Sequence, residues 1–354
     1  MKLVLVTGGA GFVGSNVALY LKRERPRWNV LCLDNLKRRG SELNLERLKE
    51  AEIEFIHGDI RSKEDLNIEK KIDLIVECSA EPSVLAGFGS SPEYVLNTNL
   101  VGTINCLELA RRDKADFIFL STSRVYPVVN LEKLSYKEES TRFVLNSEQP
   151  FVGASEEGIN TEFPLDGWRS MYGAAKLASE LIIQEYIAMY GIRAVINRCG
   201  VIAGPWQMGK VDQGVFSLWM LHHYFKTTLQ YIGFNGSGKQ VRDLLHVDDL
   251  SKLVLKELEI LPQINGKTFN AGGGKDISLS LQETTELCEE ITGNKLKINL
   301  IPETRPADIP IYISDNRKIT EATGWSPQKD AREILRDIFE WIRENEQRVQ
   351  QVLM

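Results

Sequence analysis

"KLVLVTGGAGFVGSNVALYLKRERP", residues 2–26, is typical of an apolar strand, a glycine-rich turn and an amphipathic helix. The turn contains Gly9-x-Gly11-x-x-Gly14, and glycines permit a tight turn in which backbone N–H groups approach a pyrophosphate at the positive end of the helix. Asp34 ends the next apolar segment about twenty residues on, where an acid binds the ribose hydroxyls of adenosine. The stretch therefore predicts that the chain binds a dinucleotide.

Two neighbouring features bear on which dinucleotide is bound. Asp34 is followed by Asn35, and a carboxylate at this position repels the 2′-phosphate of NADP, which favours NAD. Arg38 and Arg39 lie close by and would suit a 2′-phosphate, so NADP remains the alternative.

Strand-like and helical segments alternate through the first two hundred residues. The strand-like segments lie at 29–35, 53–60, 72–80, 116–126 and 193–202, and the helical ones at 97–112 and from Ser170 onward. This alternation predicts an α/β fold with a doubly wound parallel (Rossmann) sheet. We expect residues 1–198 to form that domain, with its sheet completed by part of 240–272, and residues 199–354 to form a smaller α/β lobe. The long irregular connection at 127–168 joins two candidate site segments, which is typical of a functional loop.

Charge and cysteine content exclude several classes of function. The net charge of -6 argues against a nucleic-acid-binding surface, and the short run "KRRG" at 37–40 fits a solvated loop or a local phosphate contact. Five scattered cysteines without a Cys-x-x-Cys pair predict neither a metal site nor a disulfide framework and suit a reducing compartment.

Nothing in the apolar pattern predicts membrane association. "MKLVLVTGG", residues 1–9, lacks the long apolar core and the cleavage site of a signal peptide. No apolar run reaches the length of a membrane span. We therefore expect a soluble, cytoplasmic protein.

"SMYGAAK", residues 170–176, places Tyr172 and Lys176 four residues apart at the start of a predicted helix, on one face. A free phenol has a pKa of about 10 and is a poor base. A nearby ammonium, helped by a cationic nicotinamide, favours the phenolate. Tyr172 would then accept a proton from a sugar hydroxyl during hydride transfer. A Tyr-x-x-x-Lys pair alone is equally typical of a solvent-exposed face, so the prediction depends on the dinucleotide turn.

A polar cluster, "LSTSRVYP" at 120–127, lies at the C-terminal end of the strand predicted at 116–126. Ligands in doubly wound sheets bind beyond the carboxyl ends of the strands. Thr122 is therefore a candidate to hydrogen-bond the reacting hydroxyl. The alternative is that its hydroxyl only caps the local backbone.

These motifs, together with "HGDI" at 57–60, "NLVGT" at 99–103 and "GSGKQVRDLLHVDDL" at 236–250, resemble those of the extended short-chain dehydrogenase/reductases. The resemblance implies a catalytic triad of Thr122, Tyr172 and Lys176. It also implies that the second lobe binds a nucleoside diphosphate sugar and that the protein forms a homo-oligomer, a dimer or tetramer. The expected cofactor contacts are Gly8, Gly11, Phe12, Val13, Gly14, Asp34, Asn35, Arg38, Asp59, Ile60, Ser79, Ala80, Asn99, Tyr172, Lys176 and Cys199.

Within that family, "NLKRRG" at 35–40, "EESTRF" at 138–143, "GKVDQGV" at 209–215 and "GKQVRDLLH" at 238–246 are most similar to the CDP-paratose 2-epimerases, also called CDP-tyvelose epimerases. This similarity implies a role in lipopolysaccharide or polysaccharide synthesis. The chain departs from the family at Glu77-Cys78-Ser79-Ala80, where relatives often have His-x-Ala-Ala.

Arginines in the C-terminal third are candidates to bind the diphosphate. Arg242 and Arg305 are single arginines in apolar or turn-like surroundings, and a guanidinium binds phosphate oxygens bidentately. The alternative for each is an ion pair with Asp243 or Asp308. The expected substrate contacts are Ser123, Arg124, Gln207, Asp212, Gln213, Arg242, Arg305 and Asp308.

The resemblance implies an NAD-dependent epimerase that oxidises the inverted carbon transiently and then reduces it again. A UDP- or GDP-hexose 4-epimerase would use the same residues. A 4,6-dehydratase needs an acid–base pair after the threonine, whereas Ser123 and Arg124 stand there. A non-catalytic NAD sensor would be expected to lack Tyr172 or Lys176.

Overall fold

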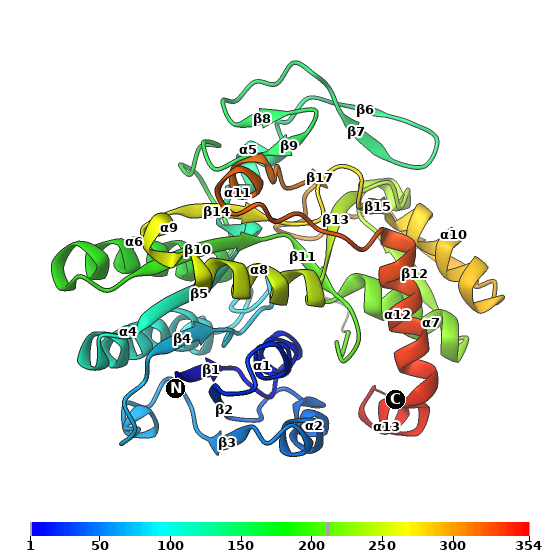
Figure 1. The fold of residues 1–354 in the computed structure, drawn as a ribbon. Helices are drawn as coiled ribbons and strands as arrows, with labels where there is room; N and C mark the ends of the chain where they lie inside the picture. The colour runs from blue at the N-terminus through cyan, green and yellow to red at the C-terminus, as the bar shows by residue number, and fades with distance from the viewer. Residues whose placement is uncertain (1, 210–212, 354) are drawn as a thin grey trace.

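The computed structural model describes residues 2–209 and 213–353, and its centre is a seven-stranded parallel sheet (Figure 1). In the order of the sheet, β3-β2-β1-β4-β5-β10-β14, the strands are Glu54–His57, Asn29–Asp34, Leu3–Thr7, Leu74–Glu77, Asp116–Thr122, Ala194–Cys199 and Thr268–Ala271. The strand order reverses between β1 and β4, and such a reversal opens a ligand crevice beyond the carboxyl ends of the strands. The predicted doubly wound fold is confirmed.

Helices cover both faces of this sheet (Figure 1). One face carries α1 (Phe12–Glu24) and α8 (Val247–Glu259), and the other carries α4 (Gly102–Asp113) and α6 (Met171–Tyr190). In β1, Val4 and Val6 enter the core beneath α1, while Leu5 enters the core beneath α4. Because both faces are buried, β1 is a nearly continuous apolar run.

The second lobe is built around β13 (Val241–His246). This strand pairs with three others: β11 (Val201–Ala203), β15 (Ser278–Ser280) and β17 (Ile311–Tyr312). A separate parallel pair consists of β12 (Leu229–Ile232) and β16 (Ile298–Ile301). Three helices share the core of this lobe: α7 (Val215–Phe225), α10 (Leu281–Thr292) and α12 (Ala331–Glu344).

The connection at 127–168 contains two small hairpins that pack on the second lobe. Its elements are α5 (Val128–Leu131), β6 (Tyr136–Glu138), β7 (Phe143–Leu145), β8 (Ala154–Ser155) and β9 (Gly158–Ile159). The Ile159 N–H donates to the Ile313 carbonyl at 2.8 Å, and the two residues share a core with Tyr126 and Tyr312. This connection therefore joins the two lobes. The remaining helices are α2 (Asn44–Glu50), α3 (Glu93–Leu96), α9 (Leu261–Ile264), α11 (Arg317–Thr323) and α13 (Glu346–Leu353).

Three further properties concern the described part of the chain. None of its helices has the length and apolar character that crossing a membrane would require. All five cysteines carry free thiols. The residues in this part form no cluster of histidine, cysteine and acidic side chains suited to a metal ion.

Glu257 of α8 is a buried carboxyl against the central sheet. Its Oε2 accepts a hydrogen bond of 2.8 Å from Asn197 Nδ2 in β10. Glu257 Oε1 and Asn197 Oδ1 have no partner among the described residues. Burial raises the pKa of Glu257 to about 8, and the bond from Asn197 opposes this only in part. A protonated carboxyl would donate its O–H to Asn197 Oδ1 and satisfy both side chains.

We expect Glu257→Gln to stabilise the protein increasingly as pH rises. The folded pKa lies above the ordinary value of 4.5. The contribution of the carboxyl to the free energy of unfolding is therefore fully present below pH 4.5. It is lost toward about pH 8, at roughly 1.4 kcal/mol per pH unit. A glutamine keeps the pairing with Asn197 and carries no charge. Urea unfolding of the two proteins across this pH range measures the divergence, and a difference independent of pH would contradict the assignment.

Candidate active site

Tyr172 and Lys176 lie on the first two turns of α6, beside the carboxyl end of β5. The Ser170 hydroxyl oxygen caps the helix by accepting a hydrogen bond of 3.3 Å from the Gly173 N–H. A Cβ at Gly173 would lie 2.1 Å from the Arg124 carbonyl oxygen. Glycine therefore lets the start of α6 approach the turn after β5, which brings Tyr172 to Thr122.

Thr122 ends β5 and contacts two neighbours. Its Oγ1 accepts a hydrogen bond of 3.2 Å from the Arg124 N–H and caps the turn Ser123–Val125. Its hydroxyl also faces the Tyr172 side chain and acts to lower the pKa of that phenol. A hydroxyl accepts and donates at once, so the backbone cap and the contact with the phenol coexist.

Burial dominates the electrostatics of the Tyr172 and Lys176 side chains. It raises the pKa of the Tyr172 phenol, and the Thr122 hydroxyl and the charge of Arg124 oppose that shift. Burial lowers the pKa of the Lys176 ammonium, and Glu77 is the strongest group that opposes it. The charge of Arg124 therefore favours the phenolate, the form that we also expect Lys176 to favour.

The glycine turn has a shape that only glycines allow. Gly8 has φ +64°, in the left-handed region, and a Cβ at Gly14 would lie 2.1 Å from the Gly8 carbonyl oxygen. The Gly11 N–H donates to that same oxygen at 3.0 Å. Phe12 and Val13 then begin α1. The cradle fits a dinucleotide pyrophosphate at the helix N-terminus.

Asp34 lies at the end of β2 and braces this turn. Its carboxylate accepts the N–H of Ala10 at 3.1 Å and that of Leu36 at 2.8 Å. Burial raises the pKa of Asp34, and these backbone bonds oppose the shift. Each carboxylate oxygen has two lone pairs, so both retain an acceptor position for the ribose hydroxyls.

Other predicted cofactor contacts are engaged within the protein. The Asn99 side chain pairs with the Glu81 backbone at 2.7 and 2.9 Å and fixes the loop that contains Ser79 and Ala80. The Arg38 guanidinium donates to the Met208 carbonyl at 2.7 Å. Ile60 is buried beneath α4, and Cys199 is buried at the end of β10.

Asp59 and Asn35 form a polar pair at the ends of β3 and β2. Asn35 Nδ2 donates to Asp59 Oδ2 at 2.8 Å. The Arg61 guanidinium binds the same carboxylate, and this hydrogen bond is the main cause that lowers the pKa of Asp59 to about 2. Asp59 is therefore an anion with a partner before any adenine approaches.

The predicted substrate arginines meet at one turn of the second lobe. Arg242 Nη2 binds Asp308 Oδ1 at 3.0 Å, which is the ion pair considered as the alternative. Arg124 Nη1 donates to the Ala307 carbonyl at 3.0 Å. The turn that contains Arg305 is therefore held by one arginine from each lobe.

The surroundings of the remaining predicted substrate contacts do not point to a particular ligand. Gln207 Oε1 accepts from the Ser217 hydroxyl at 2.7 Å, and its Nε2 donates to the Ile202 carbonyl at 2.9 Å, so its amide supports the local fold. Gln213 Oε1 is buried and has no partner among the described residues. Ser123 lies in the turn after Thr122. Asp212 lies outside the described residues.

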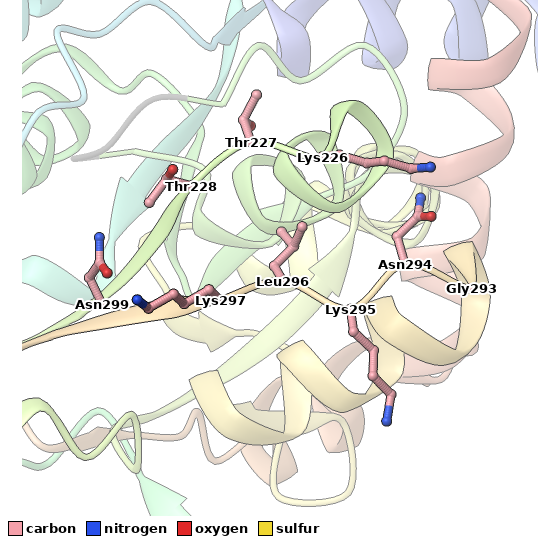
Figure 2. Close-up of a pocket in the computed structure, with 9 residues that line it drawn as sticks. All are labelled: Lys226, Thr227, Thr228, Gly293, Asn294, Lys295, Leu296, Lys297 and Asn299. Atoms are coloured by element: carbon pink, nitrogen blue, oxygen red, sulfur yellow. The ribbon is translucent and has the colours of Figure 1, made fainter.

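A cavity of about 550 Å³ lies elsewhere, between the C-terminal ends of α7 and α10 (Figure 2). Lys226, Lys295 and Lys297 line it, and none of its lining residues is a predicted site residue. Cations at helix C-termini interact favourably with the exposed carbonyl groups there. Lys226, the C-cap residue of α7, has this favourable interaction without a ligand.

Comparisons with known proteins agree with this geometry. The chain matches the NAD dependent epimerase/dehydratase family over residues 4–272. It is 32% identical to the CDP-paratose 2-epimerase of Salmonella typhi, over 96% of this chain and 99% of the relative. It is 27% identical to the dTDP-glucose 4,6-dehydratase of Mycobacterium tuberculosis, over 97% and 94%. The structure matches the UDP-glucose 4-epimerase of Thermotoga maritima with a TM-score of 0.79 and 26% identity, over 98% of this chain and all of that one.

We expect Tyr172→Phe to reduce turnover by at least about 100-fold, because the phenylalanine ring keeps the packing but cannot accept a proton. The NAD bound per purified chain, measured after denaturation, should not change. Tyr224→Phe, which removes a hydroxyl bound to Glu346 at the far end of α7, is the matched control. If Tyr172→Phe retains more than a few per cent of activity, Tyr172 is not the base.

Proposed function

The chain belongs to the NAD dependent epimerase/dehydratase family, and we propose that it epimerises a nucleoside diphosphate sugar. The inverted carbon would be C2 of a CDP-linked sugar of the CDP-paratose and CDP-tyvelose type. Support for this substrate is the 32% identity with the Salmonella typhi enzyme over nearly the whole of both chains. A role in lipopolysaccharide or polysaccharide synthesis follows from that substrate class.

The residues in the turn after Thr122 favour epimerisation over dehydration. Elimination of water needs an acid–base pair beside the reacting carbon, and Ser123 and Arg124 occupy the corresponding positions. Burial lowers the pKa of Arg124, Asp308 opposes that shift, and the guanidinium is held on the Ala307 carbonyl. A cation in this position supports a phenolate and supplies no acid.

Proton and hydride transfer would take place among groups of the NAD-binding domain. Tyr172 would take the proton of the sugar hydroxyl, while Thr122 orients that hydroxyl and Lys176 holds the nicotinamide ribose. Bound NAD, the cofactor of the family, supplies an acceptor that takes up and returns the hydrogen of the inverted carbon.

The second lobe would hold the diphosphate during inversion. Arg242 uses three of its five N–H donors on Val241, Asp308 and Ile309, so two remain for phosphate oxygens. Arg305 would bind from the adjoining turn. An anchored diphosphate lets the oxidised sugar present its opposite face to the nicotinamide.

A UDP- or GDP-hexose 4-epimerase is the second candidate, because the same side chains would serve inversion at C4. CDP-, UDP-, GDP- and dTDP-linked hexoses tested one by one, with product configuration read by NMR, distinguish these substrates. Inversion at C2 of the CDP-sugar supports the proposal. Inversion at C4, or conversion to a 4-keto-6-deoxy product, would refute it.

We expect deuterium placed at the inverted carbon to remain there in the product. Abstraction of a carbon-bound proton would instead need two opposed bases and no dinucleotide, whereas this chain offers a dinucleotide cradle and one phenol. The reaction run in D₂O with unlabelled substrate is the control, and it should introduce no deuterium at that carbon. NMR or mass spectrometry of the product measures both, and solvent deuterium at that carbon would contradict transient oxidation.

We further propose that the protein is a cytoplasmic homo-oligomer. The five free thiols suit a reducing compartment. Leu181, Met189 and Tyr190 on α6 are 63%, 67% and 50% exposed, which leaves apolar surface for a second copy.

We expect Leu181→Glu to shift the protein toward the monomer, because a carboxylate cannot be buried in an apolar interface at low cost. Leu300→Glu on β16, at a position with 60% exposure, is the matched control and should leave the assembly intact. Sedimentation equilibrium measures both. A wild-type monomer, or an unchanged assembly in the Leu181 variant, would exclude this interface.

A further inference from the structure

Glu77 is a carboxyl group buried at the carboxyl end of the central strand β4. It is fully inaccessible to solvent and lies in register with Thr7 of β1 and Phe119 of β5. Its Oε1 accepts a hydrogen bond of 2.7 Å from the Thr103 hydroxyl. Its Oε2 has no partner among the described residues. A buried carboxylate with one unsatisfied oxygen destabilises the fold, so its presence here calls for an explanation.

A chain of polar contacts links Glu77 to the helix that carries the predicted catalytic pair. The Thr103 hydroxyl lies 3.1 Å from the Asn99 carbonyl oxygen as well as against Glu77. The same carbonyl accepts a hydrogen bond of 2.8 Å from Ser179. Ser179 lies on α6, one turn beyond Lys176.

Lys176 is 1% exposed and needs a compensating charge. Its ammonium lies 3.8 Å from the centre of the Phe119 ring, the register neighbour of Glu77. Glu180, on the next turn of α6, is already bound by Arg198. Burial raises the pKa of the Cys78 and Cys199 thiols, so both are neutral at ordinary pH.

The groups around Glu77 itself offer no other cation in the described part of the chain. Thr103 and Cys106 face it from α4, and Cys78 is its neighbour in sequence. Lys176 is the charged group whose interaction favours the ionised form of Glu77. Glu77 is in turn the acid that most strongly favours the charged form of Lys176, ahead of Glu180.

We propose that Glu77 is a positioning residue of the active site, whose carboxylate is the counter-charge that keeps the Lys176 ammonium protonated beneath the nicotinamide site. This inference rests on the proposed role of Lys176. The departure from the family at 77–80 then has a physical purpose, because it places an acid where the buried lysine needs one.

The proposal has a consequence for pH dependence. Burial raises the pKa of Glu77 to about 7, while Lys176 and Thr103 oppose that shift. The counter-charge is therefore complete only above neutral pH and is lost as pH falls through this value. With Glu77 ionised, the pKa of Lys176 is higher than it would be beside a neutral side chain.

We expect Glu77→Gln to lower the pKa of Lys176 by about 1 pH unit. Protein labelled with ¹³C at the ε-carbon of lysine gives this value from an NMR titration, in which Lys176→Arg identifies the resonance. Glutamine still accepts the Thr103 hydrogen bond, so the fold should persist. Glu257→Gln removes another buried carboxyl, one that pairs with Asn197, and should leave the resonance unshifted.

Glu77→His serves if the glutamine variant does not fold, since relatives often carry histidine at this position. Its Lys176 pKa should also fall, because a neutral or cationic ring supplies no counter-charge. An unchanged Lys176 pKa in the folded variant, or an equal shift in Glu257→Gln, would overturn the proposal.

Activity provides a second, separate readout. In Glu77→Gln the high-pH limb of the rate profile should move to lower pH, whereas a purely structural defect would lower the rate equally at every pH. If the NMR shift occurs but wild-type protein converts no nucleotide sugar, the proposed function fails and the electrostatic role of Glu77 stands.

Discussion

The buried ion pair between Arg198 of β10 and Glu180 of α6 is the constraint on which the site depends. The two side chains are 6% and 5% exposed, and the guanidinium meets the carboxylate at 2.7 Å. Ser121 of β5 donates to the same carboxylate, and Arg198 also donates to the Tyr126 hydroxyl, which in turn binds Asn270 of β14. Because either charge alone would be strongly destabilising, α6 has one permitted position over β5, β10 and β14.

The fixed position of α6 determines which acidic side chains face Lys176. Glu180 lies one turn beyond Lys176, and Ser121 directly precedes Thr122, so the ion pair sets the place of both predicted catalytic groups. Because Arg198 binds Glu180, Glu180 favours the charged form of Lys176 less strongly than Glu77 does. This second acid, Glu77, lies on a neighbouring strand. The polar groups under the site thus form two separate pairs, one that orients α6 and one that balances its lysine.

The sequence revealed those features that depend on local spacing. The glycine turn, the strand–helix alternation and the one-turn separation of Tyr172 and Lys176 are all properties of contiguous residues. Asn99 shows the limit, because its side chain fixes the Glu81 backbone through a contact that depends on how α4 meets the loop after β4. The pairing of Glu77 with Lys176 depends likewise on strand register and helix packing. The only sequence signal for it was a departure from the family pattern, which names a residue but not its partner.

The turn at 305–309 lies apart from the groups proposed for proton transfer, so the choice of sugar can vary while the reaction type is kept. Ala307 adopts φ +61°, a left-handed conformation that costs a residue with a Cβ roughly 1–2 kcal/mol. Arg124 holds its carbonyl from the Rossmann side, and Arg242 holds Asp308 from the second lobe. A diphosphate would compete for these guanidinium groups, so binding there changes the contacts that restrain a strained turn. The groups that would perform proton transfer lie on the central sheet and α6. Those that would select the substrate lie where the two lobes meet. Substitutions can therefore alter the second set without disturbing the first.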